Sequence, residues 1–298
     1  MSARIIDGKL IAQQIRAELK QEVARLQREQ GITPGLGVVL VGDDPASASY
    51  VTAKETACAE IGIYSDDNRL PADTAQEALL ALVDRLNRDP RIHGILVQLP
   101  LPRHLDESAV LQAIDPDKDV DGFHPVNVGR MVLGERAFIS CTPHGVIQLL
   151  QRSGVALDGA HVVIVGRSNI VGKPLANLLV QKGPLGNATV TVCHTHTRDL
   201  ARHTLQADIV VAAAGRPKTI TADMIRAGAV VIDVGVNRIP DASRKSGFRL
   251  VGDVDFDAVK EKASLLTPVP GGVGPMTITM LLHNTVESAR QHALSATR

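Results

Sequence analysis

Four polar side chains in the first half of the chain could take part in proton chemistry. Tyr50 and Lys54 stand four residues apart in a segment of helical periodicity, so their side chains share one helix face. Gln98 closes a short apolar run, and Asp121 lies in a segment rich in Asp and Gly. Lysine, tyrosine and aspartate are side chains that serve as general acids and bases. We treat these four residues as one candidate catalytic group.

Each member of this group also has an ordinary structural interpretation. Tyrosine and lysine at this spacing are common on solvated helix faces, and Asp-rich loops are usually only hydrated. The Gly/Pro-dense segment Thr267–Pro275, which leads into a helix, is also typical of a simple turn. Periodicity and spacing alone therefore leave catalysis and plain structure as equal alternatives.

A second group of residues fits a phosphate site. The apolar strand His161–Val165 runs into Gly166, Arg167 and Ser168, and a helix follows. A glycine at the strand end lets a phosphate approach, and the helix N-terminus offers free N–H groups. The spacing is not G-x-G-x-x-G, so this interpretation depends on the position of the turn at the start of a βαβαβ unit. A glycine turn without a ligand is the alternative, and the cation and hydroxyl beside Gly166 make it the weaker one.

The next strand of that unit bears on the choice of nucleotide. NAD enzymes place an acidic residue at its end, where it binds the ribose 2′-OH. Here the strand ends in Cys193, His194, Thr195 and His196, with no carboxylate. Hydroxyls and protonatable imidazoles favour the 2′-phosphate of NADP, although both histidines could be plain surface residues. A complete set of metal ligands is missing, so we expect no metal site.

Helix and strand signals alternate along most of the chain. These helices and strands are the elements that must position the candidate catalytic group and the phosphate site. The strands are short runs of Val, Ile, Leu and Ala bounded by glycine or polar residues. This pattern predicts an α/β fold of two domains, each an open, mainly parallel sheet flanked by helices, the second Rossmann-like. We expect an irregular crossover over residues 115–134, a connecting helix over 142–154, and a long helix from Pro275 that packs back on the first domain.

The 298 residues exceed what one core usually holds, which agrees with two domains. We expect a substrate-binding and catalytic domain over residues 1–140 with 276–298, and an NADP-binding domain over 141–275.

Composition excludes several other classes of function. Lys+Arg and Asp+Glu balance at 32 each and aromatic residues make up 2%, so neither a basic field nor a stacking surface would attract nucleic acid. No apolar run is long enough to span a bilayer or form a signal peptide. Three separated cysteines without a CxxC pair indicate free thiols in a reducing compartment. We expect a soluble, cytoplasmic protein with no nucleic-acid or membrane partner.

Taken together, the motifs resemble the bifunctional methylenetetrahydrofolate dehydrogenase/cyclohydrolase family, in the family's order along nearly the whole chain. Two positions depart from the family pattern: Ser140 stands where a proline usually precedes Cys141, and His196 where some members carry Lys or Arg. The matching stretches are Tyr50-Val51-Thr52-Ala53-Lys54, Ile95-Leu96-Val97-Gln98-Leu99-Pro100-Leu101-Pro102, Lys118-Asp119-Val120-Asp121-Gly122, Cys141-Thr142-Pro143, Gly166-Arg167-Ser168, Val171-Gly172, Gly252-Asp253-Val254 and Pro270-Gly271-Gly272-Val273-Gly274-Pro275.

The resemblance implies roles for these residues. Lys54 would be the catalytic residue, hydrogen-bonded to Gln98, while Tyr50 would pack against the folate rings and Asp121 would bind the pterin edge. Further contacts to the substrate and to NADP would come from Pro270, Gly271 and Gly272 and from Gly166, Arg167, Ser168, Thr195 and the backbone of Ile232.

The resemblance also implies two reactions carried out by a homodimer that associates through the nucleotide domain. These are the NADP-dependent oxidation of 5,10-methylenetetrahydrofolate to 5,10-methenyltetrahydrofolate and the hydrolysis of that product to 10-formyltetrahydrofolate. A charged lysine would repel the cationic product of the first step, so we hypothesise that Lys54 acts as a neutral base.

We weigh three alternatives, of which the first is discarded. In short-chain dehydrogenases the Tyr-x-x-x-Lys pair follows the nucleotide loop, whereas Tyr50 precedes Gly166 by more than a hundred residues. Amino-acid or shikimate-type dehydrogenases would not need Asp121 or the Gly/Pro loop. A nucleotide-binding sensor without catalysis is disfavoured only by the presence of Lys54, Gln98 and Asp121.

Overall fold

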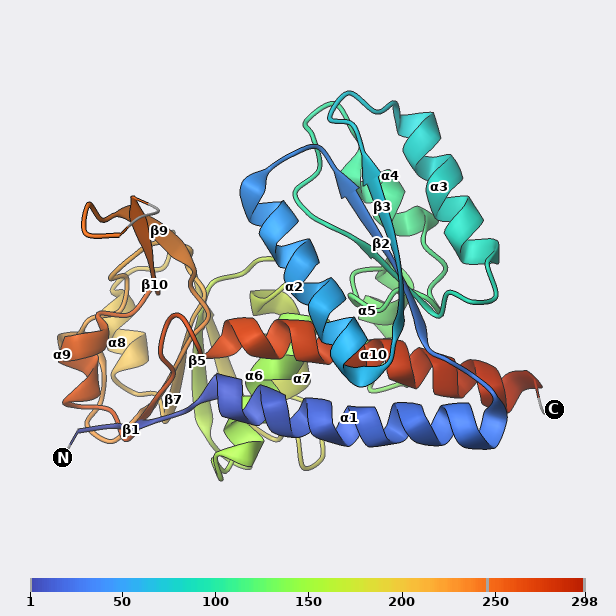
Figure 1. Cartoon of the computed structure of the whole chain (residues 1–298). Helices are drawn as coiled ribbons and strands as arrows, with labels where there is room; N and C mark the ends of the chain where they lie inside the picture. Colours follow the sequence, from blue (N-terminus) through green and yellow to red (C-terminus); the bar gives the residue numbers. More distant parts are fainter. Residues whose placement is uncertain (1, 245–246, 297–298) are drawn as a thin grey trace. The chain divides into compact units, whose positions relative to one another are not determined.

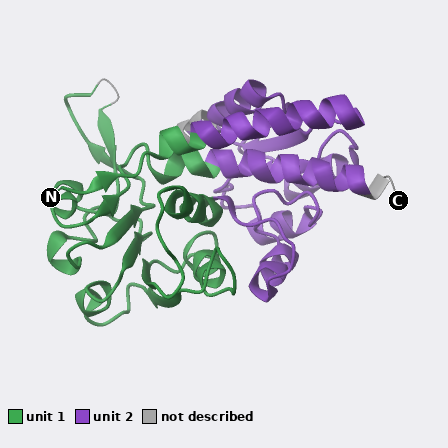
Figure 2. Cartoon of the chain, turned by 90° about the horizontal axis from the view of Figure 1, so that it is seen from below, with its two compact units in different colours: residues 1–12, 142–277 green, residues 13–141, 278–298 purple. Residues whose placement is uncertain are grey.

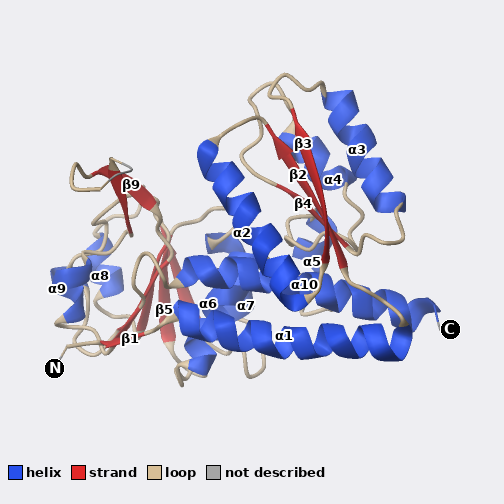
Figure 3. Cartoon of the chain, in the orientation of Figure 1, coloured by secondary structure: helices blue, strands red, loops and turns tan. Residues whose placement is uncertain are grey.

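The computed structural model describes residues 2–244 and 247–296, which divide into two compact units. Unit 1 comprises residues 1–12 and 142–277, and unit 2 comprises residues 13–141 and 278–298 (Figure 2). Both are α/β, with strands enclosed by helices (Figure 3). The predicted two-domain α/β fold is therefore confirmed. We expected residues 1–12 in the first domain, but they belong to unit 1. The reason is that the strand β1 (Arg4–Ile5) pairs in parallel with β11 (Leu265–Leu266) of unit 1.

Unit 2 contains a three-stranded parallel sheet in the order β3-β2-β4. Helices α3 and α4 cover one face of this sheet, where Leu79, Val83 and Val110 are fully buried, and α2 packs on the other face (Figure 1). β2 is the central strand: the chain passes from it to β3, on one side of β2 in the sheet, and then to β4, on the other side of β2. In open α/β sheets, ligands bind at the carboxyl ends of strands at such a switch point. The elements of this unit are β2 (Gly35–Val41), α2 (Pro45–Ile61), β3 (Tyr64–Leu70), α3 (Gln76–Arg88), β4 (Gly94–Val97), α4 (Glu107–Ala113) and α5 (Pro125–Leu133).

Unit 1 contains a six-stranded sheet in the order β1-β11-β8-β7-β5-β6, with every pair parallel. Its central strands β5, β7 and β8 are almost wholly apolar, as strands buried on both faces must be. The order reverses between β5 and β7, which makes their carboxyl ends the switch point of this sheet. The elements of this unit are α6 (Cys141–Arg152, from its second residue), β5 (His161–Val165), α7 (Gly172–Leu179), β6 (Thr189–Cys193), α8 (Leu200–Thr204), β7 (Ile209–Ala212), the 3-10 helix η1 (Ala222–Met224), β8 (Val230–Asp233), β9 (Asn237–Pro240), β10 (Phe248–Val251), α9 (Phe256–Lys260) and β11 (Leu265–Leu266).

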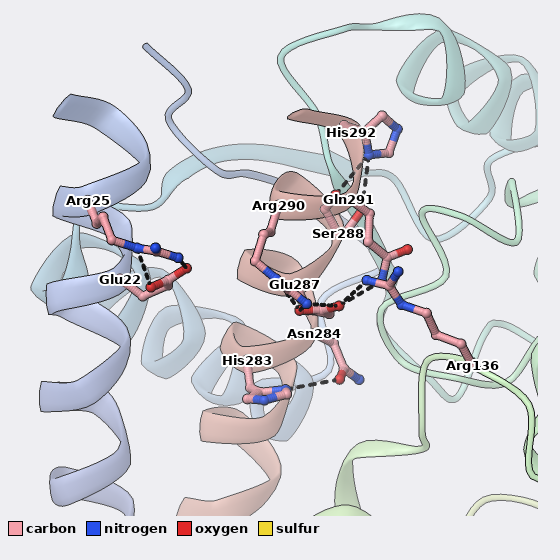
Figure 4. A network of polar contacts seen from close by, with 10 residues as sticks. All are labelled: Glu22, Arg25, Arg136, His283, Asn284, Glu287, Ser288, Arg290, Gln291 and His292. Atoms are coloured by element: carbon pink, nitrogen blue, oxygen red, sulfur yellow. Dashed lines mark hydrogen bonds and ion pairs between the residues drawn. The ribbon is translucent and has the colours of Figure 1, made fainter. Parts of the chain in front are cut away.

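Two long helices pass from one unit into the other, α1 (Gly8–Gln30) and α10 (Val273–Ala296). Their parts within unit 2 run side by side (Figures 1 and 2). On α10, Glu287 forms ion pairs with Arg136 and Arg290 (Figure 4). The prediction that the C-terminal helix packs back on the first domain is confirmed. Among the helices described, none is long and apolar enough to cross a membrane.

The prediction of an irregular crossover over residues 115–134 is wrong. This segment lies within unit 2 and contains the helix α5. His124 caps the helix by accepting the N–H of Val126, Pro125 occupies the first turn, and Gly134 ends it in the left-handed conformation. These are ordinary helix boundary signals, obscured in the sequence by the Asp- and Gly-rich residues just before them.

Candidate active site

Lys54 and Gln98 meet in unit 2 at the carboxyl edge of its sheet. Lys54 Nζ donates a hydrogen bond to Gln98 Oε1 at 3.0 Å, and Gln98 Nε2 donates to the Leu99 carbonyl at 2.7 Å. Gln98 directly follows β4, where its backbone N–H still bonds to the carbonyl of Val39 in β2. The second bond fixes the amide with its oxygen toward the amine. Lys54 is only 8% exposed, so the amine is held with little access to bulk water.

Asp121 reaches the same edge because the chain before it runs parallel to β4. Asp119 forms a bridge with Ile95 of β4, and the Ile95 N–H donates to the Lys118 carbonyl at 2.8 Å. Two residues further on, the Asp121 carboxylate lies close enough to act on the Lys54 amine electrostatically. The structure therefore brings Lys54, Gln98 and Asp121 together; strand ends led us to expect this for Lys54 and Gln98, and the family resemblance for Asp121.

Burial controls the ionisation of this group. It lowers the pKa of Lys54, and the Asp121 carboxylate opposes that shift less strongly. Burial also raises the pKa of Asp121, opposed by the Lys54 amine. Burial, and after it the charge of Asp121, raises the pKa of the buried Cys141 thiol well above its usual value, and this thiol donates a hydrogen bond to the Val120 carbonyl at 3.4 Å. A lysine whose charged form is disfavoured in this way is suited to accept a proton.

The segment around Asp121 is anchored by groups that sequence reasoning missed. Asn284 on α10 donates from Nδ2 to the carbonyls of Val120 at 2.8 Å and Ile139 at 2.9 Å (Figure 4 shows its side chain). The buried Asp119 carboxylate accepts the N–H groups of Phe123 and His124 at 3.1 and 2.8 Å. Asn284 lies 164 residues after Val120, so no local pattern could have indicated this contact.

Tyr50 lies one helical turn before Lys54 on α2. Its side chain is 44% exposed. An exposed aromatic ring one turn from a buried amine is free to stack on a flat ligand.

A separate cavity of about 490 Å³ opens at the opposite edge of the same sheet. Thr33, Tyr64, Arg91 and His93 are among its lining residues, and they flank the strand starts at Gly35 and Gly94. The amino ends of parallel strands are not where open α/β sheets bind their ligands. We therefore place the candidate site at the carboxyl edge.

In unit 1, the turn after β5 has room only for glycine. Gly166 has φ +145°, and a Cβ on it would lie 2.1 Å from the Ala213 carbonyl oxygen. Gly172, which opens α7, would place a Cβ 2.1 Å from the Gly166 carbonyl oxygen. The backbone is therefore closely packed where β5 meets the end of β7. Such bare backbone beside a helix N-terminus is the usual setting for a pyrophosphate.

Cationic and hydroxyl groups gather beside this turn. Arg167 and Ser168 are both exposed, and the Ser168 hydroxyl accepts the N–H of Val171 at 3.1 Å. At the end of the adjacent β6, burial first, then the charge of Arg167 and then the neighbouring His196 side chain lower the pKa of His194. Thr195 is exposed in the same turn. The first carboxylate after this turn in the sequence, Asp199, accepts the N–H of Arg202 and caps α8.

The remaining predicted residues of unit 1 lie at other strand ends. Ile232 is fully buried in β8, one residue before the strand ends, so it can offer a ligand only its backbone. Pro270 is exposed, whereas Gly271 and Gly272 are buried in the loop between β11 and α10. A Cβ on Gly8 would lie 1.9 Å from the Gly272 carbonyl oxygen, so this loop packs closely on the start of α1. In the part of the chain that the structure describes, no cluster of His, Cys, Asp or Glu could hold a metal ion.

The fold and these side chains define a two-domain α/β protein with one domain of the dinucleotide-binding type. Comparison with known proteins identifies both parts. Residues 6–121 match the tetrahydrofolate dehydrogenase/cyclohydrolase catalytic domain, and residues 140–293 match the NAD(P)-binding domain of the same family. The chain belongs to the tetrahydrofolate dehydrogenase/cyclohydrolase family, which confirms the resemblance seen in its motifs.

Individual relatives extend over the full length. The chain is 59% identical to the bifunctional protein FolD of Syntrophus aciditrophicus over 98% of its length and 99% of the relative's, and 60% identical to that of Dehalococcoides mccartyi with the same coverage. Among solved structures, it is similar to the bifunctional enzyme FolD of Campylobacter jejuni, at 48% identity with a TM-score of 0.92 over 98% of this chain and 100% of the other. It is also similar to the Trypanosoma brucei enzyme complexed with NADP cofactor and inhibitor, at 44% identity with a TM-score of 0.93 over 98% and 99%.

Proposed function

We propose that this protein oxidises 5,10-methylenetetrahydrofolate with NADP and then hydrolyses the 5,10-methenyl product to 10-formyltetrahydrofolate. The observation that carries the proposal is the buried Lys54 amine, bonded to Gln98 and facing the charge of Asp121, in the unit that matches the catalytic domain of the family. In this proposal, unit 2 binds the folate and unit 1 binds the dinucleotide.

Asp121 is suited to bind the pterin. The pterin edge presents a ring N–H beside an exocyclic amine, and these two parallel donors match one carboxylate. Asn284 and Asp119 hold the backbone on either side of Asp121, so its direction is set before substrate binds. The exposed ring of Tyr50 would pack against the flat folate ring system.

The oxidation depends mainly on alignment. Loss of hydride from the methylene bridge leaves a cation delocalised over two nitrogens, a step that requires neither an acid nor a base. NADP bound at the Gly166 turn would accept that hydride. The chain's own part is to orient the folate through Asp121 and Tyr50.

The hydrolysis does require a base. Water attacks the cationic carbon and must lose a proton as the new C–O bond forms. A neutral Lys54 amine can take that proton, and its lowered pKa keeps a neutral fraction available. Breaking one C–N bond, with the remaining hydroxyl proton passing to the departing nitrogen, then yields the formyl group on the other nitrogen. The Gln98 oxygen keeps Nζ in place throughout.

The residues at the dinucleotide turn favour NADP over NAD. Arg167, His194 and His196 place cationic or protonatable groups at the ends of β5 and β6, and Asp199 is already used as a helix cap. A 2′-phosphate would be attracted there, whereas a free 2′-OH would lack its usual carboxylate partner. This site fits the group because the exposed Arg167 and Ser168 stand just before the N-terminus of α7, where a phosphate would find a cation, a hydroxyl and free N–H groups.

An absorbance assay at the nicotinamide band tests both the reaction and the nucleotide. With methylenetetrahydrofolate and NADP we expect reduced nicotinamide to form, and with NAD we expect kcat/KM lower by about tenfold or more, the effect of one or two charge-assisted hydrogen bonds. No signal with either nucleotide would refute the proposed dehydrogenase, and equal rates would refute the preference.

We further propose that the protein is a homodimer associated through unit 1. β6 is the last strand of the six-stranded sheet as the structure describes it, and Val192 on this strand is 38% exposed. Such an uncovered strand can pair with a second copy. Light scattering should give twice the 31.7 kDa chain mass for the wild type and the single mass for Val192→Glu. A monomeric wild type would contradict this arrangement.

A further inference from the structure

Asp253, in the Gly252-Asp253-Val254 motif, holds the backbone at the end of β7. Its Oδ2 atom accepts the N–H groups of Ala214 at 2.6 Å and Gly215 at 2.8 Å, and its Oδ1 atom accepts Asn237 Nδ2 at 2.8 Å. The side chain is fully buried. A buried carboxylate whose oxygens are filled by donors fixes those donors in place, because each unmade bond would leave a buried polar group without a partner.

A second buried aspartate, Asp233, holds Asp253 in turn. Asp233 Oδ1 accepts the N–H groups of Gly235 and Asp253, both at 2.9 Å, and Oδ2 accepts that of Val254 at 3.0 Å. A Cβ on Gly252 would lie 1.8 Å from Asp233 Oδ2, and one on Gly235 would lie 2.2 Å from Asp253 Oδ1. The two carboxylates therefore fill space that only glycines leave open.

The backbone that Asp253 holds is the backbone that meets the dinucleotide turn. Ala213 precedes Ala214 and Gly215, and its N–H donates to the Val165 carbonyl of β5 at 2.8 Å. The Ala213 carbonyl is the atom that leaves no room for a Cβ at Gly166. A shift at Ala214 and Gly215 would therefore move the backbone that packs against Gly166 in the proposed phosphate site. This backbone lies at the point where the strand order reverses.

We propose that Asp253, supported by Asp233, is a positioning residue for the dinucleotide: it acts through Ala214 and Gly215 to hold the ends of β5 and β7 in the form that NADP binds. This inference rests on the proposed function, since it assumes that a dinucleotide occupies the Gly166 turn. It assigns a role to a sequence motif that neither the folate site nor the phosphate contacts explain.

The test is a titration of the variant Asp253→Asn with NADPH, followed by the fluorescence of the nicotinamide. Asparagine offers one acceptor oxygen and places an NH2 group against existing donors, so we expect the Kd for NADPH to rise about tenfold or more. The cyclohydrolase rate measured on methenyltetrahydrofolate without nucleotide should stay within about twofold of wild type, because that reaction does not use the dinucleotide site.

Asp208→Asn is the matched control. Asp208 also accepts a backbone N–H, that of His161 at 2.8 Å, but it precedes β7 and so lies at the opposite edge of the sheet. Its Kd for NADPH should match wild type. Asn237→Ala removes only one donor to Asp253 and should raise the Kd by a smaller factor, which keeps the test decisive if Asp253→Asn does not fold.

An unchanged Kd in a folded Asp253→Asn protein, or in Asn237→Ala where the first does not fold, would overturn the proposal. So would equal losses of NADPH binding and of cyclohydrolase rate, which indicate general destabilisation. Failure of the proposed function has a different signature: the wild type would bind NADPH without oxidising methylenetetrahydrofolate, and the titrations would still decide the role of Asp253.

Discussion

Lys54→Met is expected to lower the rate of methenyltetrahydrofolate hydrolysis by roughly 10²–10⁴-fold, the usual contribution of a general base. Methionine preserves most of the length of the lysine stem but carries no group that can accept a proton. Since Lys54 is buried with its amine bonded to Gln98, the substitution exchanges a costly buried amine for an apolar group. Because the same change leaves the Gln98 oxygen without its donor, the Tm of the variant is measured beside the rates to show that the protein remains folded.

The loss of methenyl absorbance measures this rate directly, and the nicotinamide band measures the oxidation in the same protein. Lys54→Arg separates the two roles that a lysine can have. Arginine keeps the positive charge but does not deprotonate in proteins, so it should also be inactive in hydrolysis. A Lys54→Met protein that retains the wild-type cyclohydrolase rate would refute the assignment, as would an active Lys54→Arg protein. Lys20→Met, at an exposed position on α1, serves as the unaffected control.

Most of the fold could be predicted because buried parallel strands leave a simple pattern. The strand His161–Val165 has the same bounds in the sequence prediction and in the structure. Some short strands could not be predicted, because their few residues show too little apolar periodicity. β1 has two residues and gains its place only by pairing with β11, some 260 residues later. The antiparallel pair β9 and β10 also went unpredicted, since it is stabilised by partners across a turn rather than by an apolar run.

The candidate site divides in the same way. Lys54 and Gln98 could be grouped from the sequence because the carboxyl ends of neighbouring parallel strands meet at one edge. Asp121 joined them only through its place in an Asp-rich loop and through the family resemblance. The supports of these residues could not be predicted, because tertiary packing alone selects them. Cys141 and Asn284 reach Asp121 and its neighbours from segments that the periodicity assigns to separate helices.

Asp121→Ala is expected to weaken both activities through substrate binding. Removing a carboxylate that accepts charge-assisted hydrogen bonds leaves the donors of the bound pterin without partners, which costs on the order of 2 kcal/mol, or about 30-fold in affinity. We expect the KM for the folate substrate to rise by at least that factor in oxidation and in hydrolysis alike, because the same pterin contact serves both. The Kd for NADPH should not change, since the Gly166 turn belongs to unit 1. Folate affinity equal to that of the wild type would count against a pterin contact at Asp121.

The variant Asp121→Asn connects this carboxylate to the ionisation of Lys54. In the wild type, the negative charge of Asp121 raises the pKa of the amine against the larger, opposite effect of burial. Asparagine removes that charge at nearly constant volume, so the pKa of Lys54 should fall further and the neutral amine should be populated at lower pH. The residual cyclohydrolase rate, measured at saturating folate, should then begin its rise with pH at a lower pH than in the wild type. If Asp121 only bound the substrate, removing its charge would not change the pH at which the cyclohydrolase rate begins to rise. An unshifted pH profile would therefore show that Lys54 is not the base that titrates.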